Sequence, residues 1–137
     1  MSASGLSDAI VDTILDLVVG SGADTSIFGT NDYLDFLTTA PSDDNGTGAV
    51  SWGQGRTLVT NNGTSWPSSA SGRAKTAGPV TMAKNTSGSP ITVVAFAWYS
   101  ASSGGTYKGG GPVAGGTLVI PDGTTPVFTP TLSSPSP

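Results

Sequence analysis

Short strand-like stretches, each bounded by glycine, proline or asparagine, recur along most of this chain. Its 137 residues include 20 Gly and 10 Pro, and these residue types supply the backbone angles that tight turns need. Strands separated by such turns at intervals of roughly 8–12 residues are typical of β-sandwiches and barrels. The sequence therefore predicts one domain with a mainly β fold, an antiparallel β-sandwich or barrel. The expected strands are Tyr33–Thr39, Arg56–Thr60, Pro79–Ala83, Ile91–Tyr99, Thr106–Gly110, Thr117–Ile120 and Val127–Thr129.

Three local patterns suggest how these strands connect. Ile91–Tyr99 is the longest and most apolar stretch, so we expect one continuous strand in the middle of the sheet. Pro121-Asp122-Gly123 is a tight-turn signal that predicts a hairpin into Val127–Thr129. The glycine clusters at 104–105 and 109–111 are not followed by the Lys-Ser/Thr helix of a phosphate-binding loop. We expect tight turns or a close approach of two backbones there.

The one helix that the pattern predicts runs from Leu6 to Val19. Its apolar residues fall on a single stripe, and Asp8, Asp12 and Asp16 form the opposite ridge. A helix this short is only marginally stable alone, so the stripe must dock on the domain or on a partner. The candidate interface residues are therefore Leu6, Ile10, Ile14, Leu17 and Val18.

The chain divides into three expected segments: a helical arm at 1–24, a β-sandwich domain at 25–130 and an extended Pro/Ser tail at 131–137. The arm does not have the pattern of a secretory signal, because no Lys or Arg precedes Arg56 and three Asp residues interrupt its apolar stretch. No stretch approaches the roughly 20 apolar residues of a transmembrane helix. We therefore expect no membrane contact.

The chain contains no Cys, no His and no Glu, and it carries a net charge of −4. Histidine titrates near neutral pH and cysteine is the most nucleophilic side chain there, so acid–base, covalent and transition-metal chemistry have few candidates. We predict no catalytic residue, no cofactor and no metal site. The acidic balance disfavours nucleic-acid binding. One enzymatic alternative stays open, a pair of Asp carboxyls acting on a polysaccharide.

Two further patterns have a functional and a structural interpretation. Asp43–Gly48 is acidic like a calcium loop, but Gln54 occupies the twelfth position, where such a loop needs a bidentate Glu. Asn45, Asn62 and Asn85 each begin a glycosylation acceptor triplet. In a chain this rich in Asn, Ser and Thr, turn formation explains both patterns better.

Longer patterns resemble a family of small virion proteins of tailed bacteriophages, variously described as minor capsid, head-decoration or tail-fibre-like proteins. The resemblance includes Tyr33–Asp43 after the amphipathic helix, then Ile91–Gly105, Pro112-Val113 and Gly115–Gly123. In that family a long apolar strand, a Gly-rich turn, a G-P-V segment and a strand ending in D-G succeed one another. The resemblance extends over residues 6–132 and is weakest at 61–78, where Ser and Gly dominate.

The resemblance implies a non-enzymatic virion protein that is assembled in the bacterial host cytoplasm. We expect a capsid-decoration or minor capsid (cement) protein on the capsid surface. It would bind the major capsid protein and copies of itself, as a homo-oligomer such as a trimer, and stabilise the head. The alternative is a tail-fibre or tail-tip module that binds a host surface glycan through aromatic side chains. The aromatic residues that could serve in this role are Tyr33, Trp52, Trp66, Trp98, Tyr99 and Tyr107. We expect more of them to lie in the core than on the surface.

Overall fold

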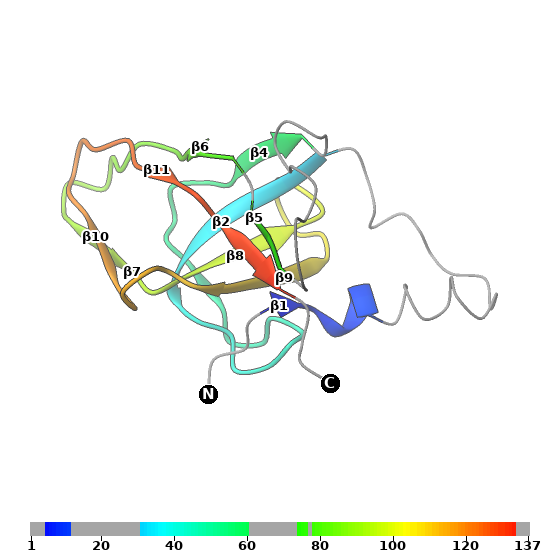
Figure 1. Cartoon of the computed structure of the whole chain (residues 1–137). Helices are drawn as coiled ribbons and strands as arrows, with labels where there is room; N and C mark the ends of the chain where they lie inside the picture. Colours follow the sequence, from blue (N-terminus) through cyan, green and yellow to red (C-terminus); the bar gives the residue numbers. More distant parts are fainter. Residues whose placement is uncertain (1–4, 12–30, 61–73, 77, 134–137) are drawn as a thin grey trace.

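The computed structural model describes residues 5–11, 31–60, 74–76 and 78–133, which form twelve short strands and one helical turn at 8–11 (Figure 1). Every strand pair among them is antiparallel, so the expected mainly β fold is confirmed. The strands are β1 (Gly5–Leu6), β2 (Asn31–Thr39), β3 (Val50–Ser51), β4 (Thr57–Thr60), β5 (Ala74–Thr76), β6 (Val80–Thr81), β7 (Ile91–Val93), β8 (Ala95–Tyr99), β9 (Tyr107–Pro112), β10 (Leu118–Ile120), β11 (Val127–Phe128) and β12 (Thr131–Ser133).

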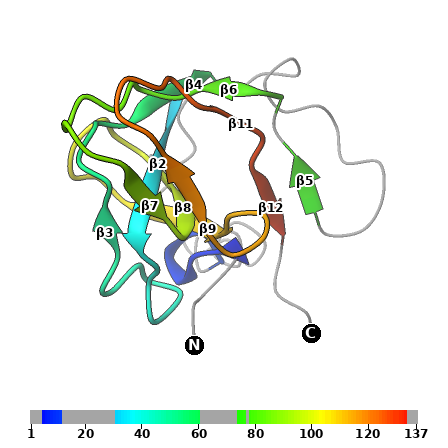
Figure 2. The same ribbon diagram turned by 90° about the vertical axis from the view of Figure 1, so that its left-hand side faces the viewer.

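Six strands form the main sheet, in the order β1-β9-β8-β2-β3, and β4 also pairs with β2. The nine-residue strand β2 has room for two partners along one edge: β4 pairs with its first half and β3 with its end. The other strands form three two-stranded sheets, β10-β7, β11-β6 and β12-β5, and Figure 2 shows β6, β11, β12 and β5 beside the main sheet. The described sheets do not close into a barrel, so of the two expected architectures the sandwich-like one is present.

The hydrophobic core lies on one face of the main sheet, which we call the core face. Leu34 lies opposite Trp98 and Phe36 lies opposite Phe96, and all four side chains are at most 3% exposed. The sheets β10-β7 and β11-β6 supply the second layer of this core through Val80, Val93, Phe128 and Ile120. The odd-numbered residues of β2 project to the opposite face, because side chains alternate along a strand.

Ile91–Tyr99 is two strands, so the expectation of one continuous strand is wrong. β7 pairs with β10, whereas β8 pairs with β2 and β9. Val93 packs in the core, but Ala95, two residues later, belongs to a cluster on the opposite face. Residues two apart on a regular strand share a face. The alternation of side chains between the two faces is therefore interrupted at Val94. Both backbone polar groups of Val94 are hydrogen-bonded there, which allows the chain to pass from one sheet to the next.

Pro121-Asp122-Gly123 forms the expected turn, but the expected hairpin is wrong. β10 and β11 pair with β7 and β6 and not with each other. The buried Asn85 explains this, because its backbone bonds to Gly123 and Thr124 and its side-chain Nδ2 donates to the Ile120 carbonyl at 2.9 Å. These bonds hold the turn against a loop distant in sequence. Asn85 Oδ1 also accepts from Ser87, in the turn geometry expected of this residue.

The helix does not begin at Leu6, so that expectation is wrong. Leu6 lies in β1, opposite Gly109 of β9, and the amide of Ser7 donates to the Lys108 carbonyl. Pairing with the edge of β9 satisfies backbone groups that the first helical turn would leave without partners. The helical turn starts at Asp8, where Ile10 is 4% exposed, and Leu6 is partly buried. The other candidate interface residues, Ile14, Leu17 and Val18, lie outside the described residues.

Both ends of the described chain lie on the β body. β1 extends the main sheet, and β12, within the segment expected to be an extended tail, pairs with β5 and contacts β1 and β9. The division into 1–24, 25–130 and 131–137 stays a prediction.

Strand β9 contains the expected close approach of backbones. A Cβ atom on Gly109 would lie 2.1 Å from the Gly5 carbonyl oxygen, and one on Gly110 would lie 2.2 Å from the Phe96 carbonyl oxygen. Neither position has space for a side chain, so the contacts of β9 with β1 and with β8 both depend on glycine.

Candidate interaction face

A row of apolar and aromatic side chains crosses the main sheet on the face opposite the core. Leu58 of β4 lies opposite Tyr33 of β2, Tyr33 opposite Tyr99 of β8, and Tyr99 opposite Tyr107 of β9. Residues directly opposite on antiparallel strands project to the same side. We call these four residues the aromatic row. Leu58 is 52% exposed, Tyr33 and Tyr99 are half-buried, and Tyr107 is buried.

Arg56 fixes the middle of the aromatic row. Its guanidinium carbon lies 3.6 Å from the centre of the Tyr99 ring, a cation–π contact. Its Nη1 donates to the carbonyls of Ala101 and Gly104, at 2.7 and 2.8 Å, and so ties the loop after β8 to the segment before β4. A guanidinium can make these contacts together because it is planar and has several fixed donors.

Asp35 balances the charge of Arg56. It lies two residues beyond Tyr33 on the same face, and its Oδ2 is 3.8 Å from Arg56 Nε. Asp35 is 2% exposed, and this burial raises the pKa of its carboxyl above 3.8, although the hydrogen bond from Ser51 Oγ and the charge of Arg56 act in the opposite direction. The carboxylate therefore joins β2 to β3 and to Arg56.

The acidic turn at 43–48 covers the buried end of the row. A Cβ on Gly46 would lie 2.7 Å from Tyr107 Cγ, so the turn packs directly on this ring. Asp43 Oδ1 accepts from the amides of Asn45 and Thr47, each at 3.0 Å, and the backbone bond from Thr47 is the main reason why the pKa of Asp43 is lowered. The carboxylate thus stabilises a turn, as the structural interpretation of this segment expected.

Burial raises the pKa of Tyr107 to about 12 from 10.0, which makes stability depend on pH in alkaline solution. Between these two values the unfolded chain releases the phenolic proton and the folded chain keeps it. The contribution of the protonated Tyr107 phenol to the free energy of unfolding is therefore fully present below pH 10, and it is lost as the pH rises to about 12. We expect Tyr107→Phe to lose less stability than the parent over this range. Urea unfolding at a series of pH values measures this, and equal losses in both proteins would contradict it.

The carboxyls of β2 do not form the pair that a polysaccharide-cleaving enzyme needs. Asp32 lies beside Lys108 near the core face, whereas Asp35 lies beside Arg56 on the opposite face. Within the described ranges, no cluster of three or more Asp, Glu, His or Cys side chains has metal-binding geometry. The exposed end of the aromatic row, in contrast, leaves Leu58 and part of Tyr33 accessible to another surface.

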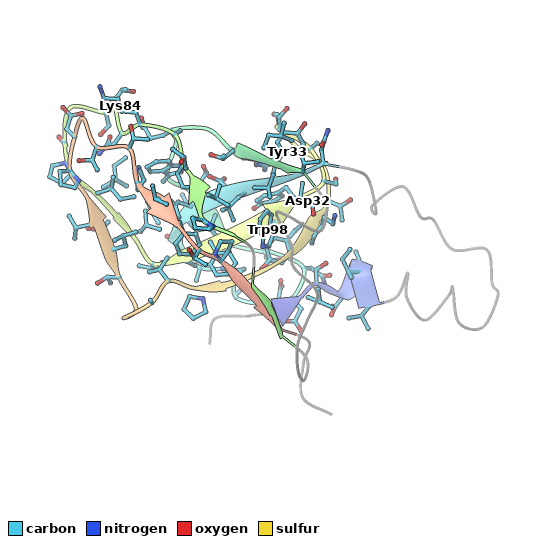
Figure 3. All side chains as sticks on the ribbon, turned by 45° about the horizontal axis from the view of Figure 1, so that its top comes forward. Asp32, Tyr33, Lys84 and Trp98 are labelled. Atoms are coloured by element: carbon cyan, nitrogen blue, oxygen red, sulfur yellow. The ribbon has the colours of Figure 1, made fainter. Side chains whose placement is uncertain are left out.

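The predicted aromatic residues divide between core and surface. Trp52 and Trp98 are 4% and 1% exposed and lie in the core, and Trp66 lies outside the described residues. Tyr33, Tyr99 and Tyr107 come together in the aromatic row; Figure 3 shows Tyr33 and Asp32 at the same end of the molecule, far from Lys84. Sequence reasoning missed Leu58 and the pairing of Arg56 with Asp35. Period-two alternation in Arg56–Thr60 was the one signal that could have placed Leu58 and Arg56 on one face.

No helix among the described residues has the length and hydropathy needed to cross a bilayer.

Comparison with known proteins identifies a family. A family model described as Gp80, podophage GP4 fiber I protein gp80, matches residues 5–129. That range contains every strand of the main sheet and the whole aromatic row. No match was found among curated proteins. Because the match extends over most of the chain, this protein belongs to the podophage GP4 fiber I protein gp80 family, a family of structural proteins of the tailed-phage virion.

Proposed function

We propose that this chain is a non-enzymatic structural subunit of a podophage fibre. The observation that carries the proposal is the family match over residues 5–129, whose description names a fibre protein. The chemistry of the described residues supports it. Asp32, Asp35 and Asp43 each bind a basic side chain or a backbone amide within the chain, so these groups hold the fold together.

The exposed end of the aromatic row is the contact surface that we propose for a neighbouring virion subunit. Leu58 is half exposed and lies beside the partly buried Tyr33, so docking would remove apolar area from water without unfolding anything. Glycan stacking has less support, because Arg56 already occupies one face of the Tyr99 ring and the turn at Gly46 covers Tyr107.

Capsid decoration, the more specific expectation from the sequence, is the second candidate. Neighbouring subunits would then cover three further exposed apolar residues: Val50, Val119 and Val127, which are 50–65% exposed. In that role the chain would sit on the capsid surface and bind the major capsid protein as a homo-oligomer such as a trimer. Self-association and the identity of the partner are proposals in both roles.

Immunogold labelling of intact particles separates the two candidates. We expect label on the fibres, and label confined to the head would reject the fibre proposal in favour of decoration. Particles that lack the protein add a second measurement. Under the fibre proposal the heads keep their thermal and osmotic stability, whereas a decoration protein should lower both when it is removed.

The contact surface is tested by changing Leu58 to Asp. A charge at the centre of a dry contact should reduce incorporation into particles by at least about tenfold, equivalent to roughly 1.4 kcal/mol. The matched control is Val119→Asp on β10, where the parent side chain is similarly exposed at 56%. Quantitative blotting of purified particles gives the result. We expect Val119→Asp to be incorporated normally under the fibre proposal. Normal incorporation of Leu58→Asp would show that the aromatic row is not the contact surface, and an equal loss in both variants would show that the effect is not specific to the row.

A further inference from the structure

Lys108 and Asp32 form an ion pair inside the domain. The two residues are 8% and 7% exposed, and Lys108 Nζ contacts Asp32 Oδ1. Asp32 lies in β2 and Lys108 in β9, and β8 separates these two strands in the sheet. Lysine is seldom buried in this way. Lys84, for comparison, is exposed at the far end of the molecule (Figure 3).

The ionic form of this pair offers more hydrogen-bonding groups than the contact between Lys108 Nζ and Asp32 Oδ1 uses. An ammonium has three donors and a carboxylate is an acceptor with several lone pairs. Among the described residues, the side-chain contact of Lys108 Nζ is the one with Asp32 Oδ1. The other ion pair differs, because Arg56 also donates to two carbonyls and Asp35 also accepts from Ser51. Moving two charges out of water carries a desolvation penalty, which further hydrogen bonds such as those of Arg56 help to offset.

The use of lysine in this pair also suggests a role other than a salt bridge. Arginine is the usual choice for a buried ion pair, because it stays charged and its donors are fixed in one plane. The Arg56–Asp35 pair follows this rule, whereas the similarly buried Lys108–Asp32 pair uses lysine. Lysine can lose its proton in an apolar site and become a nucleophile. A carboxyl group in direct contact with it is an electrophile once it is protonated.

We propose that Lys108 and Asp32 condense to form an amide cross-link between β9 and β2. A proton first passes from Nζ to the Asp32 carboxylate, which removes both charges from the interior. The Nζ lone pair then adds to Cγ, and the bond from Cγ to the hydroxyl oxygen breaks. One water molecule leaves, and it carries that oxygen and both hydrogens that the reaction releases. No oxidant or other reactant is needed, and direct contact supplies effective molarities on the order of 10⁵–10⁸ M.

The product has fewer hydrogen-bonding groups than the ion pair. A secondary amide has one N–H and one C=O, in place of three ammonium donors and two carboxylate oxygens. The cross-link joins positions 76 residues apart in a chain that has no cysteine for a disulfide. Such a link restricts the unfolded chain in the same way as a disulfide does, and it forms without an oxidising compartment. It suits a virion protein that must persist outside the cell.

Intact-mass spectrometry of the purified full-length chain tests the cross-link. We expect the denatured protein to be one water molecule lighter than its sequence mass. Peptide mapping should find the segment that contains Asp32 joined to the segment that contains Lys108. A chain with the full sequence mass after folding would overturn the proposal, and so would a water loss that maps to any other pair of residues.

Two variants separate the cross-link from the ion pair. Lys108→Arg keeps the positive charge but cannot form the amide, so it should have its full sequence mass and a lower unfolding temperature than the parent. Asp35→Asn changes the other ion pair and should still lose one water. A water loss that persists in Lys108→Arg would refute the assignment. If Lys108→Arg does not fold, the peptide map of the unaltered chain decides alone, since it needs no variant.

Discussion

Gly110→Ala is expected to remove a large part of the stability of the folded protein. The new Cβ would lie 2.2 Å from the Phe96 carbonyl oxygen and 3.1 Å from Ala97 Cα, so β9 and β8 could not keep their pairing. These obstacles are backbone atoms in the middle of the main sheet, which cannot rotate out of the way as a flexible side chain can. We expect a loss of about 4 kcal/mol or more, which is a large part of the stability of a typical domain. Urea unfolding followed by circular dichroism measures it.

Gly88→Ala is the matched control for this prediction. Gly88 has a φ of +85° but no atom within 4 Å of the Cβ position, so alanine there meets backbone strain without a clash. The expected cost is about 1–2 kcal/mol. Gly110 presents the opposite case, a clash at a position without positive φ. If both variants lost similar stability, the loss at Gly110 would reflect the missing flexibility of glycine in general and not the close approach of β9 to β8.

The individual strands could be predicted because their evidence is local. Alternation and turn residues placed strands at Tyr33–Thr39 and Thr117–Ile120, and the structure has β2 and β10 there. Strand partners depend on contacts between distant residues, and no local pattern reports them. Ile91–Tyr99 is apolar apart from Thr92, so its sequence does not mark the position, Val94, at which the side-chain alternation shifts. The bond from Asn85 to the Ile120 carbonyl joins residues 35 apart, which is why the turn at Pro121 was mistaken for a hairpin.

The candidate interaction face was predictable only in part. Tyr33, Tyr99 and Tyr107 were candidates as aromatic residues, but their alignment in one row depends on the register of β2, β8 and β9. That register includes an irregularity between Trp98 and Tyr99, next to Lys108 on the paired strand. A single irregular position determines which residues of β9 share a face with β2. The pairing of Asp32 with Lys108 was invisible in the sequence for the same reason.

Trp98→Ala is expected to cause the largest loss among side-chain truncations in the core. Trp98 is 1% exposed and lies opposite Leu34 in the middle of the main sheet, within the cluster that joins both layers. Replacement with alanine removes a large buried ring and leaves a cavity. β8 is paired with a strand on each side, so the backbone cannot move in to fill that cavity. Such changes cost about 3–5 kcal/mol. Chemical unfolding followed by far-ultraviolet circular dichroism measures the change without depending on tryptophan fluorescence.

Leu58→Ala gives the control, because Leu58 is also a large apolar residue of the main sheet but is 52% exposed. Its truncation should change the free energy of unfolding by no more than about 0.5 kcal/mol. The two residues project to opposite faces of the sheet, and the comparison therefore tests which face contains the core. Similar losses for both variants would mean that the aromatic row is as well packed as the interior of the chain. The row would then belong to the fold, and the exposed contact surface proposed around Leu58 would have to be abandoned.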